Sequence, residues 1–87
     1  WHARRLLDLA EEAGIPILGS SLTESGLAVA AMGALFGAYK LAGPADFNGP
    51  QMLRAAPGVP PWDIEEGYLI LPQGPGIGIT PELERLA

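Results

Sequence analysis

The stretch LGSSLTESGLAVAAMGALFGAY, Leu18 to Tyr39, joins the end of an apolar segment to a polar hinge and then to a long uncharged segment. Ile15 to Gly19 is a candidate strand. The following Ser21-Leu22-Thr23-Glu24 has the spacing of a capping box, in which the serine hydroxyl binds a free amide of the first helical turn and the glutamate reaches back. We therefore expect a helix that begins near Leu22 and, if the chain has a functional site, a site at the hinge.

No charged residue occurs between Ser25 and Tyr39, and apolar side chains occupy almost every direction around the helix axis. A helix that is apolar all round is buried on most sides. A membrane span is the main alternative, but the uncharged run is shorter than the roughly 18 residues that a span needs. Gly33 and Gly37 form a GxxxG pair, which in a soluble chain indicates close packing of the helix.

The segments on either side of this helix predict a parallel crossover. Trp1 to Gly14 has apolar residues at helical spacing and is followed by Pro16, which cannot continue a helix. Ala45 to Asn48 predicts a very short strand that ends at Gly49-Pro50. Strand, helix and strand in this order predict a right-handed parallel unit. Because parallel sheets are covered on both faces, we expect further strands from an upstream segment or another chain.

The next part of the chain predicts a connection and then a hairpin. Gln51 to Trp62 is rich in proline and predicts a connection over the surface. Asp63 to Leu71 predicts two short strands with Glu66-Gly67 at the turn.

The last part predicts irregular backbone before a short helix. Pro72 to Ile79 is an arm of glycine and proline that lacks the lysine and the helix start of a phosphate-binding loop. Thr80 is a candidate N-cap with Pro81 at the first helical position, for a helix that runs through Leu86.

The composition argues against several functions. The chain has 87 residues and a net charge of −5, with 48% hydrophobic and 17% charged residues. A chain without a basic patch does not replace phosphate counterions, which argues against nucleic acid as a partner. The absence of cysteine removes disulfides and thiolate metal sites and is compatible with a cytoplasmic location. So little charge on a small domain favours a piece of something longer.

Among the polar residues, Asp46 has the most unusual setting. It lies among apolar residues and glycines where a parallel strand would end, and α/β folds bind ligands at the carboxyl ends of parallel strands. The alternative, favoured by spacing alone, is an aspartate that caps the turn before Gly49-Pro50. The other candidates are interpreted as solvated or helix-end residues: His2, Glu65, Glu66 and Glu82.

Several motifs together resemble a known family. G-S-x-x-x-E-S-G at 19–26, D-x-N-G-P at 46–50 and L-P-x-G-P-G-x-G at 71–78 are similar to the carboxyl-terminal part of the muconate lactonizing subgroup of the enolase superfamily, which are relatives of mandelate racemase. The resemblance covers essentially the whole chain. It implies an α/β fold, as the C-terminal fragment of a modified TIM barrel that is accompanied by a capping domain.

The resemblance also implies a domain division. Residues 1–50 would end the barrel domain, and residues 51–87 would form a connection, a hairpin and a short helix that pack towards the capping domain. The implied barrel elements are the sixth helix, seventh strand, seventh helix and eighth strand: Trp1–Gly14, Ile15–Gly19, Leu22–Lys40 and Ala45–Asn48.

The family's chemistry uses a divalent metal, usually Mg²⁺, that holds a substrate carboxylate while a base removes the adjacent proton. The resemblance therefore implies a racemase, epimerase, cycloisomerase or dehydratase with a small carboxylate substrate. The metal ligands and lysine bases would lie outside this chain, the last lysine a few residues before Trp1, so we expect no activity from the chain alone. The implied full-length enzyme is a homo-oligomer without nucleic acid or membrane partners.

For the site, the resemblance implies that Asp46 is the eighth-strand acid. In muconate lactonizing relatives that acid lies beside the substrate carboxylate and metal, and in dipeptide epimerase relatives it belongs to a D-x-D pair that takes the substrate ammonium. Here Asn48 replaces the second carboxylate, which weakens the ammonium interpretation. Ser20, Ser21 and Glu24 match the polar hinge at the barrel mouth, which implies substrate contact or orientation. The capping box remains the alternative for Ser21 and Glu24.

Two other hypotheses come from the residues alone. One is a truncated, non-catalytic module that binds a partner through apolar helix faces, and the other is an independent small β-α-β domain. A lysine just before Trp1 and acidic residues on earlier strands would favour the enzyme.

Overall fold

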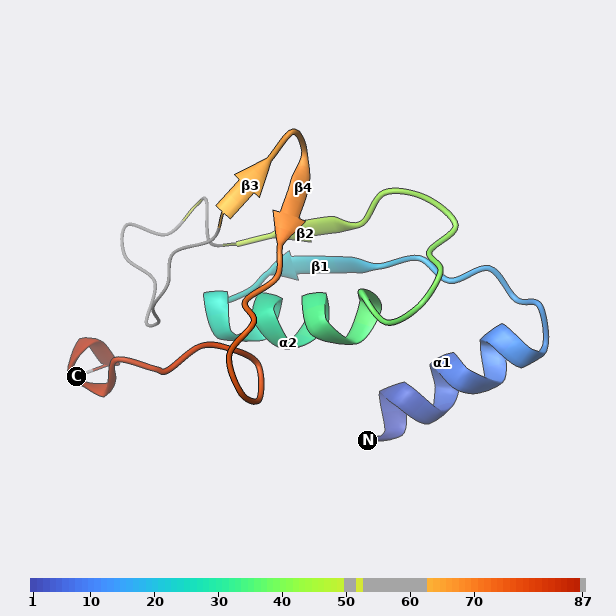
Figure 1. Ribbon diagram of the computed structural model, residues 1–87, viewed down its shortest axis with the longest axis horizontal. Helices are drawn as coiled ribbons and strands as arrows, with labels where there is room; N and C mark the ends of the chain where they lie inside the picture. The colour runs from blue at the N-terminus through green and yellow to red at the C-terminus, as the bar shows by residue number, and fades with distance from the viewer. Residues whose placement is uncertain (50–51, 53–62, 87) are drawn as a thin grey trace.

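The computed structural model describes residues 1–49, 52 and 63–86 and has mixed helix and strand content, which confirms the α/β class (Figure 1). The elements are α1 (His2–Glu12), β1 (Ser20–Thr23), α2 (Gly26–Phe36), β2 (Asp46–Asn48), β3 (Asp63–Glu65), β4 (Tyr68–Ile70) and the 3-10 helix η2 (Leu83–Leu86). The predicted connection Gln51 to Trp62, apart from Met52, lies outside the described residues.

Strands β1 and β2 form a parallel sheet of two strands that α2 connects (Figure 1). Ser20 is in register with Asp46, and Thr23 with Asn48. An isolated parallel bridge between Ile17 and Leu41 extends this pairing towards the N-terminus. The predicted parallel crossover is therefore confirmed.

The position of the first strand was predicted wrongly. Within Ile15 to Gly19 only Ile17 takes part in a bridge, and the strand itself is Ser20–Thr23. Ile15 and Leu18 are 59% and 70% exposed, so this apolar run does not form a buried strand in the described chain. The position of β1 is determined by its pairing with β2. The hydrophobicity of the segment does not show which residues pair with β2.

The start of the central helix was also predicted wrongly. Ser25 is the N-cap of α2, and its hydroxyl oxygen accepts a hydrogen bond from the Ala28 backbone N–H at 3.2 Å. The capping box at Ser21 to Glu24 does not form. Ser21 to Thr23 belong to β1, and the Glu24 N–H is hydrogen-bonded to β2, before the helix begins. The helix ends at Phe36, before the predicted Lys40.

One face of α2 packs closely against the hairpin and the segment after it. A Cβ built on Gly33 would lie 2.8 Å from Leu71 Cδ2 and 3.4 Å from Leu69 Cδ2, and one on Gly37 would lie 2.8 Å from Leu71 Cδ1. The GxxxG pair thus provides close packing, as predicted. Gly26, Val29, Ala30 and Gly33 are buried, and within α2 only Ala31 and Ala34 are exposed, so the helix is covered on most sides, as expected.

Strands β3 and β4 form the predicted antiparallel hairpin. Glu66 and Gly67 lie between them with φ of 49° and 82°, so both turn residues are left-handed, as in a type I′ turn. The predicted last helix is shorter than expected: η2 begins at Leu83, and Thr80 belongs to an isolated bridge rather than to a cap.

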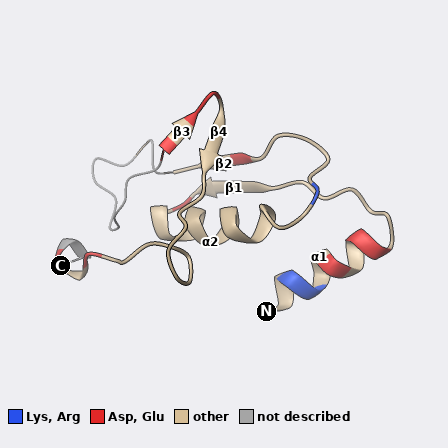
Figure 2. Ribbon diagram, in the orientation of Figure 1, with Lys and Arg blue, Asp and Glu red and all other residues tan. Residues whose placement is uncertain are grey.

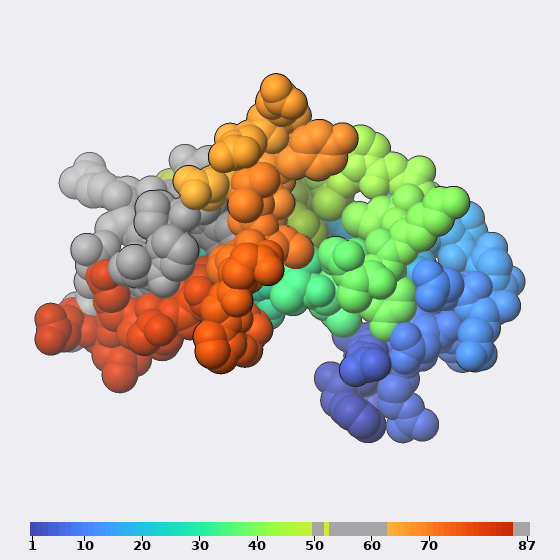
Figure 3. Space-filling model, in the orientation of Figure 1, coloured from blue at the N-terminus to red at the C-terminus, as the bar shows by residue number. Residues whose placement is uncertain are grey.

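The described core is small. Its buried apolar residues are Ile17, Val29 and Ala30. Many large apolar side chains are exposed instead, among them Leu6, Leu9, Ile15, Leu18, Leu22, Ile64 and Tyr68. The hairpin and the glycine arm cover part of α2 in the middle of the molecule, whereas α1 lies at one end, away from the C-terminal segment (Figure 3). No helix in the described part of the chain is both long and apolar enough to cross a membrane.

A polar contact joins α1 to the segment after α2. The Tyr39 hydroxyl donates to Asp8 Oδ1 at 2.6 Å and lies 3.2 Å from the Arg4 carbonyl oxygen. The hydrogen bond to Asp8, then burial and the Asp8 charge, raise the pKa of Tyr39 above its ordinary value of 10.0. The contact stabilises the fold below pH 10.0 and is lost as the pH rises through the raised pKa, because the phenolate no longer donates.

Asp8→Asn should lower the pH at which Tyr39 ionises, because it removes the carboxylate that accepts the phenol proton. The measurement is a titration of tyrosinate absorbance, compared with Glu11→Gln as a control on the same helix. Identical curves for Asp8→Asn and the unmodified protein would contradict the contact.

Gly49 should tolerate no side chain. Its φ is 140°, and a Cβ there would overlap the Glu24 backbone. We expect Gly49→Ala to lower the free energy of unfolding by about 2–4 kcal/mol. Gly43→Ala is the matched control, because no atom lies within 4 Å of its added Cβ. Urea unfolding of both variants checks this, and equal midpoints would refute the close approach.

Candidate functional site

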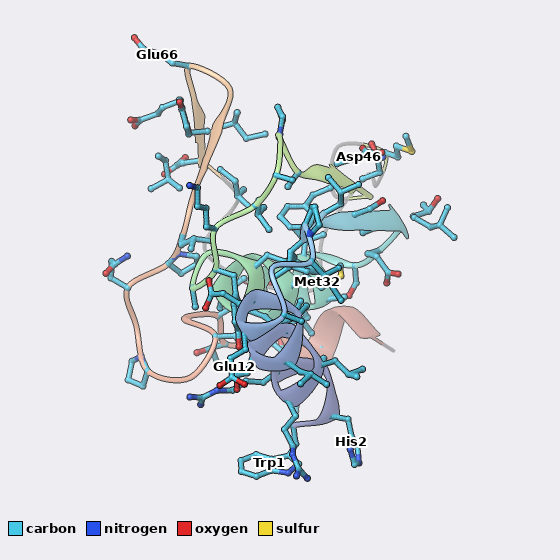
Figure 4. The ribbon with its side chains drawn as sticks, turned by 90° about the vertical axis from the view of Figure 1, so that its right-hand side faces the viewer. Trp1, His2, Glu12, Met32, Asp46 and Glu66 are labelled. Carbon is cyan, nitrogen blue, oxygen red and sulfur yellow. The ribbon has the colours of Figure 1, made fainter. Side chains whose placement is uncertain are left out.

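Two polar side chains project from β2 on the side away from α2. Phe47, between them, faces α2, because its ring centroid lies 6.1 Å from that of Phe36. Side chains alternate along a strand, so Asp46 and Asn48 both lie on the opposite side. Figure 4 shows Asp46 at the β2 strand, away from the hairpin β3–β4. These two residues form the centre of the candidate site.

The two side chains are hydrogen-bonded to each other. The Asn48 side-chain amide donates from Nδ2 to Asp46 Oδ1 at 2.6 Å. An ionised carboxylate only accepts hydrogen bonds, so the NH₂ group of Asn48 must face Asp46. Asp46 is exposed and Asn48 is half-buried, so the amide is the more enclosed partner.

Ser21 takes part in the pairing of the two strands. Its hydroxyl oxygen accepts the Asn48 backbone N–H at 3.0 Å, and the hydroxyl lies 3.4 Å from the Asn48 carbonyl oxygen. Three residue steps separate Ser20 from Thr23, whereas two separate Asp46 from Asn48, so β1 carries an extra residue. Bulges of this kind re-aim side chains and are common next to active sites.

The remaining hinge residues lie beside this pair. Ser20 is exposed and in register with Asp46. The Glu24 backbone N–H donates to the Asn48 carbonyl oxygen at 3.1 Å, and the Asp46 N–H donates to the Gly19 carbonyl oxygen at 2.9 Å. The structure therefore brings Ser20, Ser21, Asp46 and Asn48 together, with Glu24 attached through its backbone.

The described residues of the site do not complete a metal centre. No group of three or more His, Cys, Asp or Glu side chains that could hold a metal ion occurs in the described ranges. Figure 2 shows the blue Lys and Arg positions on α1 and after α2, whereas the coloured position on β2 is acidic. A Mg²⁺ site cannot be assigned to this part of the chain.

A separate hollow on the exposed face of α1 contains none of the candidate residues. It is lined by His2, Arg5, Leu6, Asp8, Leu9 and Glu12. His2 is exposed, in agreement with its interpretation as a solvated residue. One helix alone forms this hollow, and none of its lining residues belongs to β1 or β2.

The parallel β-α-β unit has polar side chains along β2 up to its carboxyl end at Asn48, and α/β folds bind ligands at that end of parallel strands. The chain belongs to the enolase C-terminal domain-like family, whose model matches residues 1–85. This confirms the resemblance at the level of the enolase superfamily. Neither a curated protein nor a solved structure matches the chain.

The sequence analysis missed two local contributors to the site. Ser25, two residues after the end of β1, is the N-cap of α2. Gly49, directly after β2, allows a close contact with the Glu24 backbone. Ser25-Gly26 could have indicated the cap, because serine is favoured at this position. The contact at Gly49 has no signal in the local sequence.

Ser21→Ala should lower the free energy of unfolding by about 1–3 kcal/mol, because the half-buried Asn48 N–H loses its acceptor. Ser20→Ala is the control: the residue is exposed, so the change should stay within about 0.5 kcal/mol. Chemical unfolding of the two variants measures this difference. Equal losses would show that the Ser21 hydroxyl does not support the strand pairing.

Proposed function

We propose that this chain is the C-terminal part of a metal-dependent enzyme of the muconate lactonizing subgroup. The enzyme would remove the proton adjacent to a substrate carboxylate and so form an enediolate. Racemisation, epimerisation, cycloisomerisation or elimination could follow, depending on residues outside the chain. The family match over residues 1–85 supports the superfamily part of this proposal.

The observation that carries the proposal is the position of Asp46. Its exposed carboxylate projects from the first residue of β2, two residues before the carboxyl end of the strand at Asn48, on the side opposite Phe47 and α2. In α/β folds that end of the strands is where ligands bind. If further strands continue the sheet into a barrel, Asp46 and Asn48 face its interior.

In this proposal Asp46 contacts the substrate directly and accepts a hydrogen bond from it. Ser20, in register with Asp46, supplies a second polar contact. Ser21, through its hydroxyl, and Glu24, through its backbone N–H, fix the Asn48 backbone and thereby orient the site. None of these residues is assigned as the base that removes the substrate proton.

The proposed Mg²⁺ would be held by residues outside this chain and would stabilise negative charge on the substrate carboxylate. The proposed partners of the whole protein are a small carboxylate substrate and further copies of itself. The exposed apolar residues, such as Leu18 and Leu22, support extensive contacts with other protein segments.

The second candidate function is a non-catalytic interaction module. The exposed apolar side chains of α1, Leu6 and Leu9, favour it, because a large apolar surface indicates a protein interface. The two candidates differ in one property: only the enzyme requires the Asp46 carboxylate for the exchange of a substrate proton.

Asp46→Ala in the whole protein should lower kcat/KM for α-proton exchange about 10- to 100-fold, through loss of a hydrogen bond to a charged group. The free energy of unfolding should change little, because Asp46 is exposed. Exchange into D₂O, followed by NMR across a panel of carboxylates, measures the effect. Asp63→Ala, an exposed acid on β3, is the control. Unchanged exchange with normal folding would refute the role of Asp46.

A further inference from the structure

We propose that Asn48 is a positioning residue that holds Asp46 so that the pair receives an uncharged hydrogen-bond donor of the substrate, such as a hydroxyl or amide. The inference rests on the proposed function, because it names the substrate group that the same site accepts. It is carried by the 2.6 Å hydrogen bond from Asn48 Nδ2 to Asp46 Oδ1.

Asn48 is well placed to orient another side chain because its own backbone is fixed on both sides. Its N–H donates to Ser21 Oγ at 3.0 Å, and its carbonyl oxygen accepts the Glu24 N–H at 3.1 Å. Its side chain is half-buried. Asp46 is exposed, and an exposed side chain without a partner would rotate among several rotamers. The amide therefore restricts a carboxylate that burial does not restrict.

The hydrogen bond also determines what Asp46 offers to a ligand. One carboxylate oxygen accepts from the amide, which leaves the second oxygen, Oδ2, as an acceptor for a further donor. The pair has a single negative charge, on Asp46. The Asn48 amide is uncharged and directs the positive end of an N–H bond towards the carboxylate. Among the described residues, the pair thus supplies one strong acceptor at this point.

An uncharged donor suits this arrangement better than an ammonium group. A hydroxyl or amide N–H needs one acceptor, whereas an ammonium group has three donors and a charge that must be compensated when water is removed. Ser20, the residue in register with Asp46, is uncharged. Glu24 is attached to the site by its backbone N–H, so among the described residues Asp46 is the one carboxylate that the hydrogen bonds fix at this point. The structure therefore favours a substrate whose group at this position is neutral.

The test uses the whole protein with Asn48→Leu, which removes the amide at similar volume, and Asn48→Asp, which adds a second charge. Gln73→Leu is the matched control, because the Gln73 side-chain amide is exposed and donates to the Leu71 carbonyl oxygen, away from β2. Three-bond NMR couplings report the Asp46 χ1 rotamer. Asn48→Leu should spread Asp46 over several rotamers, and Gln73→Leu should leave a single one.

The kinetic probes are two carboxylates of the same carbon skeleton, one with a hydroxyl and one with an ammonium group at the same carbon. For the hydroxyl compound, Asn48→Leu should raise KM about tenfold with little change in kcat. Asn48→Asp should shift the ratio of kcat/KM values towards the ammonium compound by about tenfold or more. Gln73→Leu should change neither.

The outcomes separate this inference from the proposed function. Loss of exchange in Asp46→Ala, together with an unchanged Asp46 rotamer and KM in Asn48→Leu, would overturn the role of Asn48 and keep the enzyme assignment. An unmodified protein that prefers the ammonium compound would overturn the substrate class. No effect of Asp46→Ala would overturn both.

Discussion

The parallel pairing of β1 with β2 is the constraint on which the rest of the structure depends. It is held by a side chain as well as by the backbone, because the Ser21 hydroxyl bonds the Asn48 N–H where β1 carries its extra residue. This pairing fixes where α2 can begin, and it places Phe47 against α2. Asp46 and Asn48 are consequently directed to the other side. One bulged strand pair thus connects the fold with the candidate site.

The same sheet explains why so much apolar surface is exposed. Among the described residues, the sheet of β1 and β2 has both edges and one face uncovered. Parallel sheets are normally buried on both faces. Leu18 and Leu22, near and within β1, are 70% and 83% exposed. The chain belongs to the enolase C-terminal domain-like family. In the whole enzyme that we propose, further strands and helices would cover this surface.

The sequence predicted the elements more reliably than their boundaries. The hairpin turn at Glu66-Gly67 and the packing of Gly33 and Gly37 were predictable, because turn chemistry and small-residue spacing are local signals. The first strand and the start of α2 were not, because local capping competed with pairing to a strand more than twenty residues away in sequence. Asp46 was found from its setting, whereas its hydrogen bond to Asn48 needed the structure.

The central claim is that the Asp46–Asn48 side of the sheet faces the reaction centre. The most direct test adds Mn²⁺ in place of Mg²⁺ to the whole protein and measures paramagnetic broadening of side-chain amide signals by NMR. We predict strong broadening of the Asn48 amide and little broadening of the exposed Gln73 amide after the hairpin. Equal broadening of the two signals, or none at Asn48, would contradict the claim.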